Sequence, residues 1–389
     1  MTLARYFDIV FIMSPTNEHR FLFASFAEKL KKRILAGYYP VNSYLPSIRK
    51  LQEQFGISKN TILASLKLLA NEKIIARGNS PRQGYKVIQE PINYELEGEN
   101  QSHKAVKFIM PFSYWNCIGN ELLEGMEHTF SKNETSILFA NHNNSIEKEE
   151  LLLNRLITKS FSIVDALFLT VSRSVHNSNI ELLNTIQDHF PLILVDRYIY
   201  GFSAHYIGVN NKKIGYEAAL HLVNQGHTRM AFISGFGIVS TIKDRLEGFR
   251  EGLLERNIEL ESSSVLVSPY CYKSLESTEK TGYDFGEKLF SSGGPSPTAV
   301  FCGSDKEAYG LLNYCRSHSI RIPEDLAIVG CDNDMFFGEK CQINLTTFDY
   351  PIKAIVHEMY NLFHQLKTTP SLPLRSIEFE AEFIRGESS

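Results

Sequence analysis

The feature that most constrains the fold is an alternation of short apolar runs with longer amphipathic segments, which starts at Val106 and continues almost to the end of the chain. Such runs, bounded by turn residues, are typical of strands buried in parallel sheets. The candidate strands are residues 106–110, 136–140, 166–170, 192–195, 230–234, 264–267, 299–302 and 326–329. The candidate helices are residues 121–130, 146–159, 214–225, 245–256, 278–290 and 306–318. This pattern predicts an α/β domain with parallel sheets, and its length favours two lobes over one large sheet.

Residues 20–88 show a different pattern, with three helical periodicities followed by two short apolar runs. The first helix carries an apolar stripe and can end at Gly37; the stripe is Leu22, Phe26, Leu30 and Ile34. A second helix is predicted over residues 46–55, and Ser58 can N-cap a third whose inner face is Ile62, Leu66 and Leu69. The tight turn at Gly56 makes the last two a helix-turn-helix, and residues 74–77 and 85–87 predict a hairpin wing. Such a unit presents the first turn of its second helix to the major groove, so the candidate base readers are Lys59, Asn60 and Leu63.

The charge of the chain is divided unequally between its two parts. Residues 1–88 contain 14 Lys and Arg against 5 Asp and Glu, whereas residues 89–389 contain 26 against 39. A basic module joined to an acidic body indicates a polyanionic partner, because clustered Lys and Arg displace counterions from phosphate backbones. Between them, the polar and acidic residues 89–103 are predicted to be a linker.

The sequence contains no recognisable catalytic or cofactor motif. We find no Walker A, GxGxxG, GxSxG or HExxH pattern, so we predict neither catalytic residues nor a cofactor. The six cysteines have no zinc spacing, which predicts reduced, mostly buried thiols and no metal site. The apolar run Ile9–Met13 is too short for a secretory signal or a membrane span, so we expect a cytoplasmic protein without membrane association.

The N-terminal module resembles the DNA-binding domain of the GntR family. The resemblance is carried by Leu45-Pro46-Ser47-x-Arg49, by Phe55-Gly56-Ile57-Ser58, by Thr61 and by the glycine-bearing wing. It implies DNA contacts by Arg49, Ser58, Lys59, Asn60, Thr61 and the wing residue Gly78. Lys59 and Leu63 stand where that family usually has arginine, so the operator sequence does not follow from the resemblance.

The α/β domain resembles the effector domain of the LacI/GalR repressor family, which has the two-lobed fold of type I periplasmic sugar-binding proteins. Matching segments include "FPLILVDRY", "DRLEGFREGLLERNI", "PTAVFCGSDKEAYGLL" and "IPEDLAIVGCDND". Ligands of such sheets bind at the carboxyl ends of the strands, where carboxylates, guanidinium groups and aromatic faces suit a sugar. The implied effector contacts are Tyr114, Trp115, Asp196, Arg197, Arg245, Ser304, Asp332 and Tyr350. Ser304 stands where many relatives carry asparagine, and we expect the neighbouring Asp305 to cap a helix.

Together the two resemblances indicate a regulator similar to arabinose-repressor-like proteins. We predict a winged helix-turn-helix over residues 20–88, a linker over 89–103 and an effector domain over 104–389, with lobe crossings near 208–211 and 344–350. The predicted function is a homodimeric repressor of sugar-utilisation genes that binds operator DNA and is released by a monosaccharide. A transport-associated sugar-binding protein and a sugar-modifying enzyme are the alternatives. The sugar itself stays open, with L-arabinose and L-fucose as examples.

Overall fold

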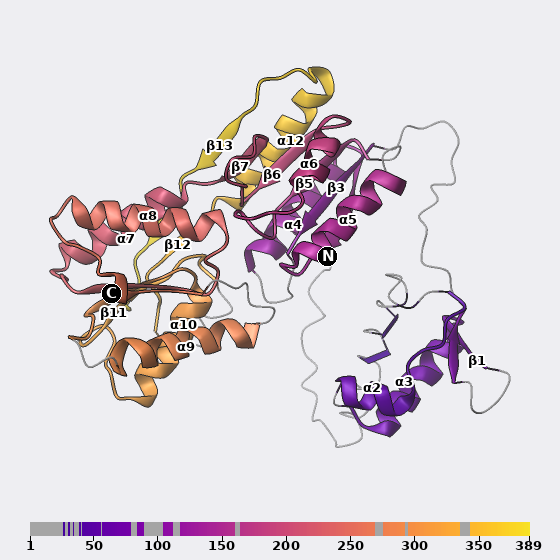
Figure 1. The fold of residues 1–389 in the computed structure, drawn as a ribbon, viewed down its shortest axis with the longest axis horizontal. Coiled ribbons are helices and arrows are strands. Elements are labelled where there is room, and N and C mark those ends of the chain that lie inside the picture. Colours follow the sequence, from indigo (N-terminus) through magenta and orange to yellow (C-terminus); the bar gives the residue numbers. More distant parts are fainter. Residues whose placement is uncertain are drawn as a thin grey trace, which may run out of the picture. The chain divides into compact units, whose positions relative to one another are not determined.

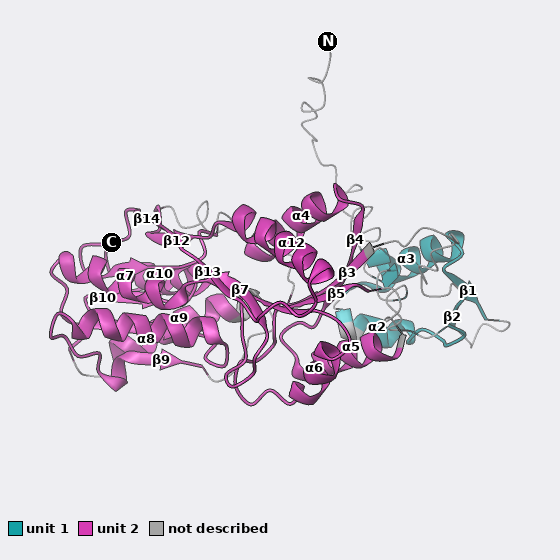
Figure 2. Ribbon diagram, turned by 90° about the horizontal axis from the view of Figure 1, so that it is seen from above, with its two compact units in different colours: residues 1–101 teal, residues 102–389 magenta. Residues whose placement is uncertain are grey.

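The computed structural model describes residues 26–27, 30–31, 34, 39, 41–55, 57–78, 84–88, 104–111, 117–159, 164–268, 275–291, 295–334 and 343–389. The chain divides into two compact units, residues 1–101 and 102–389, which Figure 2 shows in teal and magenta. The expected linker, residues 89–103, and the uninterpreted segment 1–19 lie outside the described residues.

Unit 1 has the three-helix and hairpin pattern expected of a winged helix-turn-helix. Its first helix is described only at a few positions between residues 26 and 34, and the predicted helix stops Gly37 and Gly56 lie outside the described residues. Helix α2 spans Ile48–Phe55 and α3 spans Lys59–Asn71; strands β1 (Ile75–Arg77) and β2 (Tyr85–Val87) pair antiparallel. The predicted stripes meet in one apolar core, whose members include Phe26, Leu30, Ile34, Leu51, Ile62, Leu66 and Leu69.

Unit 2 contains two parallel sheets, one in each of two lobes (Figure 1). The first lobe has a six-stranded sheet in the order β13-β7-β6-β5-β3-β4. Its strands are β3 (Lys104–Met110), β4 (Thr135–Asn141), β5 (Ala166–Leu169), β6 (Leu192–Val195), β7 (His205–Val209) and β13 (Ser376–Phe379). Its helices are α4 (Cys117–Ser131), α5 (Ile146–Lys159), α6 (Ile180–Gln187) and α12 (Ile352–Thr368). Apolar side chains of α5 and α6 cover one face of the sheet, and those of α4 and α12 cover the other.

The second lobe repeats this architecture on a smaller scale, with a sheet in the order β11-β10-β8-β9. Its strands are β8 (Met230–Ser234), β9 (Val265–Val267), β10 (Ala299–Cys302) and β11 (Ala327–Val329). Helices α7 (Asn211–Asn224) and α8 (Ser240–Leu254) pack on one face; α9 (Leu275–Ser291) and α10 (Asp305–Ser317) pack on the other. An antiparallel pair, β12 (Thr347–Asp349) with β14 (Glu382–Ile384), and a short 3₁₀ helix, η1 (Ser262–Ser264), complete the lobe.

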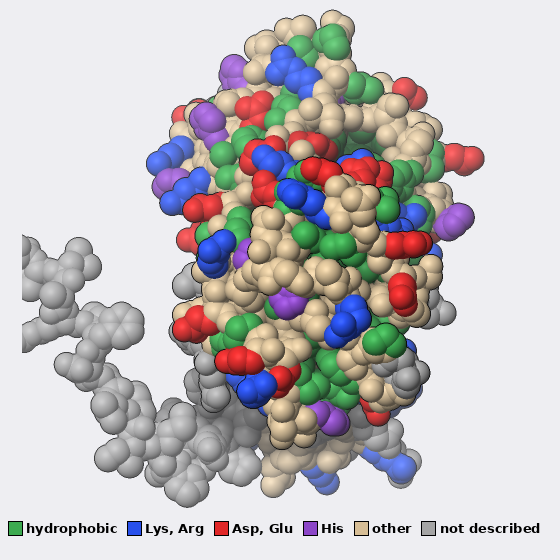
Figure 3. Space-filling view, turned by 90° about the vertical axis from the view of Figure 1, so that its left-hand side faces the viewer, with side chains coloured by type: hydrophobic (Ala, Val, Ile, Leu, Met, Phe, Trp, Pro, Cys, Tyr) green, Lys and Arg blue, Asp and Glu red, His purple; other side chains and the backbone are tan. Residues whose placement is uncertain are grey.

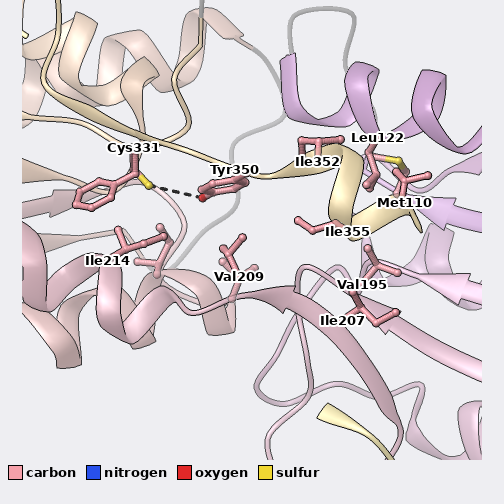
Figure 4. Close-up of a cluster of buried hydrophobic side chains, with 14 of the residues drawn as sticks. Met110, Leu122, Val195, Ile207, Val209, Ile214, Cys331, Tyr350, Ile352 and Ile355 are labelled. Carbon is pink, nitrogen blue, oxygen red and sulfur yellow. Dashed lines mark hydrogen bonds between the residues drawn. The ribbon is translucent and has the colours of Figure 1, made fainter. Parts of the chain in front are cut away.

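The chain passes between the lobes three times. It crosses between β7 and α7 at Asn210, between β12 and α12 near Tyr350, and between β13 and β14 at residues 380–381. Buried apolar side chains make the core continuous through this region, including Val209, Ile214 and Ile352 around Tyr350 (Figure 4). The third crossing was not predicted, because it depends on the late strand β13 pairing with the much earlier β7.

Within the described residues of unit 2, the predicted elements are largely present, and four strands and two helices were missed. The predicted strands 192–195, 230–234 and 299–302 coincide with β6, β8 and β10, but α8 begins at Ser240, five residues before the predicted start. Strands β7, β12, β13 and β14 and helices α6 and α12 were not predicted. Within the described residues, no helix combines the length and apolarity needed to traverse a bilayer.

Candidate functional site

The first candidate site is the exposed start of α3 in unit 1. Ser58 is the N-cap of this helix, as predicted, and its hydroxyl accepts a hydrogen bond from the Thr61 amide at 3.2 Å. Lys59 and Asn60 follow on the exposed first turn. Helix N-termini carry unpaired backbone donors and partial positive charge, so this turn is suited to meet a phosphate or a base edge.

The other predicted DNA contacts differ in exposure. Arg49 is exposed on α2, and Gly78 follows β1 at the base of the wing, where its amide donates to the Gly84 carbonyl at 2.9 Å. Thr61 is only 7% exposed, and its hydroxyl oxygen lies 2.8 Å from that of Ser58. The position of Thr61 favours a supporting role, in which it orients Ser58.

The second candidate site lies between the lobes of unit 2, at the carboxyl ends of both sheets. In the first lobe, Asp196 directly follows β6 and has a φ of 65°, a left-handed conformation that non-glycine residues rarely adopt. Its carbonyl accepts from the Tyr206 hydroxyl at 3.1 Å. Burial raises the pKa of the Asp196 carboxyl, and the guanidinium groups of Arg197 and Arg245 oppose this rise.

Arg197 is held against the same end of the first sheet. Its Nη1 donates to Asn144 Oδ1 at 2.8 Å and to the Val171 carbonyl at 3.2 Å. Its Nε lies 3.6 Å from Asp196 Oδ2, is buried, and has no hydrogen-bond partner. A buried donor without a partner costs about 1–3 kcal/mol, so this nitrogen is a candidate ligand contact.

In the second lobe, Arg245 is the central charged side chain. It lies on α8 and is 4% exposed. Its Nε donates to Asn211 Oδ1 at 2.8 Å, and its two terminal nitrogens contact the Gly303 carbonyl and the Tyr350 hydroxyl. Arg245 therefore ties together the start of α7, the end of β10 and the second lobe crossing.

Asp332 contacts the same Tyr350 hydroxyl as Arg245 does. The Tyr350 hydroxyl donates to Asp332 Oδ1 at 3.1 Å, and the same oxygen lies 3.7 Å from Arg245 Nη1. Asp332 has a φ of 115°, which makes it the second strained carboxylate residue of this region. Burial raises its pKa to about 6 against the opposing charges of Arg245 and Lys306.

Tyr350 is only 7% exposed, whereas an aromatic ring that lines a binding site would present a face to the ligand. Its ring lies in the apolar core around the crossing, where its hydroxyl is 3.6 Å from Cys331 Sγ (Figure 4). The other two aromatic residues expected at the site, Tyr114 and Trp115, lie outside the described residues.

Ser304 follows β10 and faces a carboxyl group that the sequence did not indicate. Its hydroxyl donates to Glu307 Oε2 at 2.7 Å, while Glu307 Oε1 accepts from the Gly235 amide at 2.6 Å. Glu307 is fully buried, and burial raises its pKa to about 7. The expectation that Asp305 caps a helix was wrong: it accepts from the Asp334 amide and the Thr347 hydroxyl, and so holds the loop after β11.

The structure thus brings Asp196 and Arg197 of one lobe together with Arg245, Asp332 and Tyr350 at the other, with Ser304 beside them. The residues that sequence reasoning missed are the supporting ones, Asn144, Asn211 and Glu307. Asn144 follows Asn143 in a turn in which both have positive φ, and the Asn-Asn pair was the only sequence signal for it. Nothing in the local sequence around Glu307 indicated that this helical glutamate is buried beside Ser304.

Comparison with known protein families gives a match in each unit. Residues 24–87 match the family of bacterial regulatory proteins, gntR family, and residues 219–389 match the periplasmic binding protein-like domain. The chain is a DNA-binding transcriptional regulator. The predicted combination of a GntR-type helix-turn-helix with a LacI-like, periplasmic binding protein-like domain is confirmed.

The regulator is similar along most of its length to curated repressors. It is 23% identical over 326 residues to the arabinose metabolism transcriptional repressor of Halalkalibacterium halodurans, covering 83% of each chain. It is 27% identical over 270 residues to the transcriptional repressor PurR of Vibrio vulnificus, covering 69% of this chain and 76% of that protein. Both similarities are longer than unit 1, so both include residues of unit 2.

Solved structures share the fold of the regulator. The transcription regulator CcpA of Lactococcus lactis superposes with a TM-score of 0.62 at 21% identity, covering 74% of this chain and 99% of that one. The transcriptional regulator CelR in complex with cellobiose superposes with a TM-score of 0.64 at 18% identity, covering 89% of this chain and all of that one. At these identities the likeness establishes the fold alone.

Proposed function

We propose that this regulator is a cytoplasmic, homodimeric repressor of sugar-utilisation genes whose affinity for operator DNA falls when a monosaccharide binds between the lobes of unit 2. The observation that carries the proposal is the meeting of two strained carboxylate residues, Asp196 and Asp332, with two arginines at the carboxyl ends of facing sheets. The repressor names of the relatives support repression as the action of the DNA-bound protein.

The hydrogen-bonding capacity left at this site suits a neutral, hydroxyl-rich ligand. A guanidinium group has five N–H donors, and Arg245 commits three of its five to Asn211, Gly303 and Tyr350. Arg197 keeps its unpartnered Nε, and Asp332 keeps Oδ2, since Tyr350 and Arg245 contact its Oδ1. Two carboxylates and two guanidinium groups balance in charge, so a neutral ligand that both donates and accepts fits better than an anion.

The DNA contacts proposed for unit 1 are Arg49, Ser58, Lys59, Asn60 and Gly78, with Thr61 as the residue that orients Ser58. Helix-turn-helix dimers bind two half-sites about one helical turn or a multiple apart, so a small reorientation of the two readers breaks their register. We infer that movement of the lobes on sugar binding supplies this reorientation. The remaining effector contacts, Ser304, Tyr350, Tyr114 and Trp115, are proposed to complete the pocket.

A gel-shift series with operator DNA at fixed salt, with and without each sugar of a monosaccharide panel, tests the proposal. A panel that includes L-arabinose and L-fucose is first ranked by thermal shift, since a sugar at a hundred times its Kd stabilises the native state by about 2.7 kcal/mol. Operator binding that ignores every sugar would remove the sensor role. Failure to bind any operator-like DNA would remove the direct regulator role.

The variant Arg245→Ala sharpens the test. We expect it to abolish the sugar response while operator binding persists, because Arg245 is buried in unit 2 and its contacts all lie there. Isothermal calorimetry measures the sugar affinity directly. A normal sugar affinity in Arg245→Ala would defeat the assignment of Arg245 to the effector site.

A further inference from the structure

Beside the effector site, two tyrosines of the first lobe contact one carboxyl group of the second. The Tyr198 hydroxyl donates to Asp244 at 3.0 Å from either carboxyl oxygen, and the Tyr200 hydroxyl donates to Asp244 Oδ1 at 3.1 Å. The tyrosines lie in the turn between β6 and β7, whereas Asp244 lies on α8. These hydrogen bonds therefore join the two lobes directly.

Backbone groups extend the same contact toward the start of α8. The Ser240 amide donates to Ser174 Oγ at 2.7 Å, the Ser174 amide donates to the Ile238 carbonyl at 2.9 Å, and the Tyr198 amide donates to Ser240 Oγ at 3.1 Å. Ser174 and Ser240 are both fully buried. The first turn of α8 is thus capped by a hydroxyl group from the other lobe, and this contact would be lost if the lobes separated.

Ring contacts connect the tyrosines to each other and to their own lobe. The Tyr198 ring packs against Tyr206 and Tyr200, with ring centroids 5.4 Å and 5.1 Å away. Lys243 of the other lobe lies over the Tyr200 ring, 5.2 Å from its centroid. Burial raises the pKa of Tyr198 to about 12, so its hydroxyl stays protonated and able to donate.

On both lobes these residues are chain neighbours of the effector contacts. Tyr198 follows Asp196 and Arg197 in the sequence, and Asp244 immediately precedes Arg245. The hydrogen bond between Tyr198 and Asp244 therefore joins segments adjacent to both halves of the proposed effector site. This arrangement gives the contact a role beyond ordinary packing.

We propose that Tyr198, Tyr200 and Asp244 form a latch that holds the lobes in the arrangement seen here and so positions the two halves of the effector site. The link to the effector rests on the function proposed above. A ligand that contacts both halves of the effector site binds only those molecules in which the two halves are in place. Opening the latch reduces the fraction of such molecules, and the apparent affinity for the ligand falls in proportion to that fraction. These three are positioning residues and make no contact with the ligand.

Hydrogen exchange of the ligand-free full-length protein tests the latch without any sugar. The variant Tyr198→Phe/Tyr200→Phe removes only the two hydroxyl groups. We expect the amides of Ser174 and Ser240 to exchange at least about tenfold faster, because the loss of even one hydrogen bond to a charged acceptor produces a change of this size. Tyr216→Phe is the matched control, since its hydroxyl bonds Glu255 within one lobe. Amides of the core strand β10 report global stability and should not change.

Two results would overturn the latch. The first is an exchange rate of the Ser174 and Ser240 amides in the double variant that equals their rate in Tyr216→Phe. The second is an increase in the exchange of the β10 amides as large as that of the Ser174 and Ser240 amides, which would show general destabilisation. If the double variant fails to fold, Tyr200→Phe alone is decisive, because Tyr200 is 41% exposed and its hydroxyl is dispensable for packing. Adding Asp244→Asn to the double variant should cause no further acceleration.

The effector arm of the experiment measures sugar affinity by calorimetry in the same variants. We expect an apparent Kd about tenfold weaker in Tyr198→Phe/Tyr200→Phe and unchanged in Tyr216→Phe. If the sugar affinity of the double variant is unchanged while its amides exchange faster, the contact between the lobes is structural and does not position the effector site. If the unaltered protein binds no sugar, the function proposed above fails, while the exchange measurement still decides whether the latch exists.

Discussion

The buried glutamate of α10 predicts a marked pH dependence of stability. Glu307 is fully buried, and desolvation raises its pKa from the ordinary 4.5 to about 7 despite hydrogen bonds from the Gly235 amide and the Ser304 hydroxyl. Between pH 4.5 and 7 the unfolded chain therefore loses this proton while the folded chain keeps it. The folded state is favoured below this range and loses stability as the pH rises through it.

The size of the effect follows from the two pKa values. A difference of about 2.5 pH units at 1.36 kcal/mol per unit makes the contribution of Glu307 about 3 kcal/mol less favourable above pH 7 than below pH 4.5. Glutamine has nearly the same shape, does not ionise, and can still accept from the Gly235 amide. Glu307→Gln should therefore remove this part of the pH dependence and be more stable than the unaltered protein at pH 8.

Calorimetric unfolding at a series of pH values checks this prediction. The change in stability between pH 5 and pH 8 should be smaller in Glu307→Gln by about 2.5 kcal/mol, because part of the effect falls below pH 5; this is about 4 °C in Tm for a domain of this size. Glu259→Gln, the same change at an exposed position, is the control and should leave the pH profile unaltered. Parallel pH profiles for Glu307→Gln and the unaltered protein would show that Glu307 does not carry the pH dependence.

Two further predictions concern the DNA-binding unit and the packing of the second lobe. Arg49→Ala should weaken operator binding and reduce the slope of log K against log salt by about 1 if Arg49 makes the proposed DNA contact through a phosphate. Fluorescence anisotropy across a salt series measures this, and an unchanged slope would contradict a phosphate contact. Gly248→Ala should destabilise unit 2 by about 1–3 kcal/mol, because a Cβ on this residue of α8 would overlap the Lys212 carbonyl of α7. An exposed helical glycine would instead gain about 1 kcal/mol from alanine, so a rise in Tm would refute the close approach of these helices.

The surface of unit 2 is consistent with the charge division seen in the sequence. On the face shown in Figure 3, Lys and Arg side chains are interleaved with Asp and Glu. Ion pairs such as that of Lys212 with Glu247 and Glu251 belong to this mixed surface. The excess of basic residues in the N-terminal part of the chain thus remains the electrostatic feature that favours DNA.

Local sequence was sufficient for features that arise from neighbours in the chain. The apolar spacing predicted the helices of unit 1, Ser58 was identified as a cap, and the strand-end positions of Asp196 and Asp332 followed from apolar runs that end just before them. These inferences succeed because a cap, an amphipathic face or a strand end is determined within a few residues of the chain.

Tertiary structure decided what depends on contacts between distant segments. Strand β13 pairs with β7 about 170 residues earlier, which creates the third crossing between the lobes, and no local pattern records such a pairing. Likewise Glu307 and Asp244 look like ordinary helix-surface carboxylates in the sequence. Only the fold buries one beneath Ser304 and places the other against tyrosines of the opposite lobe, because burial and partner choice are properties of the packed chain.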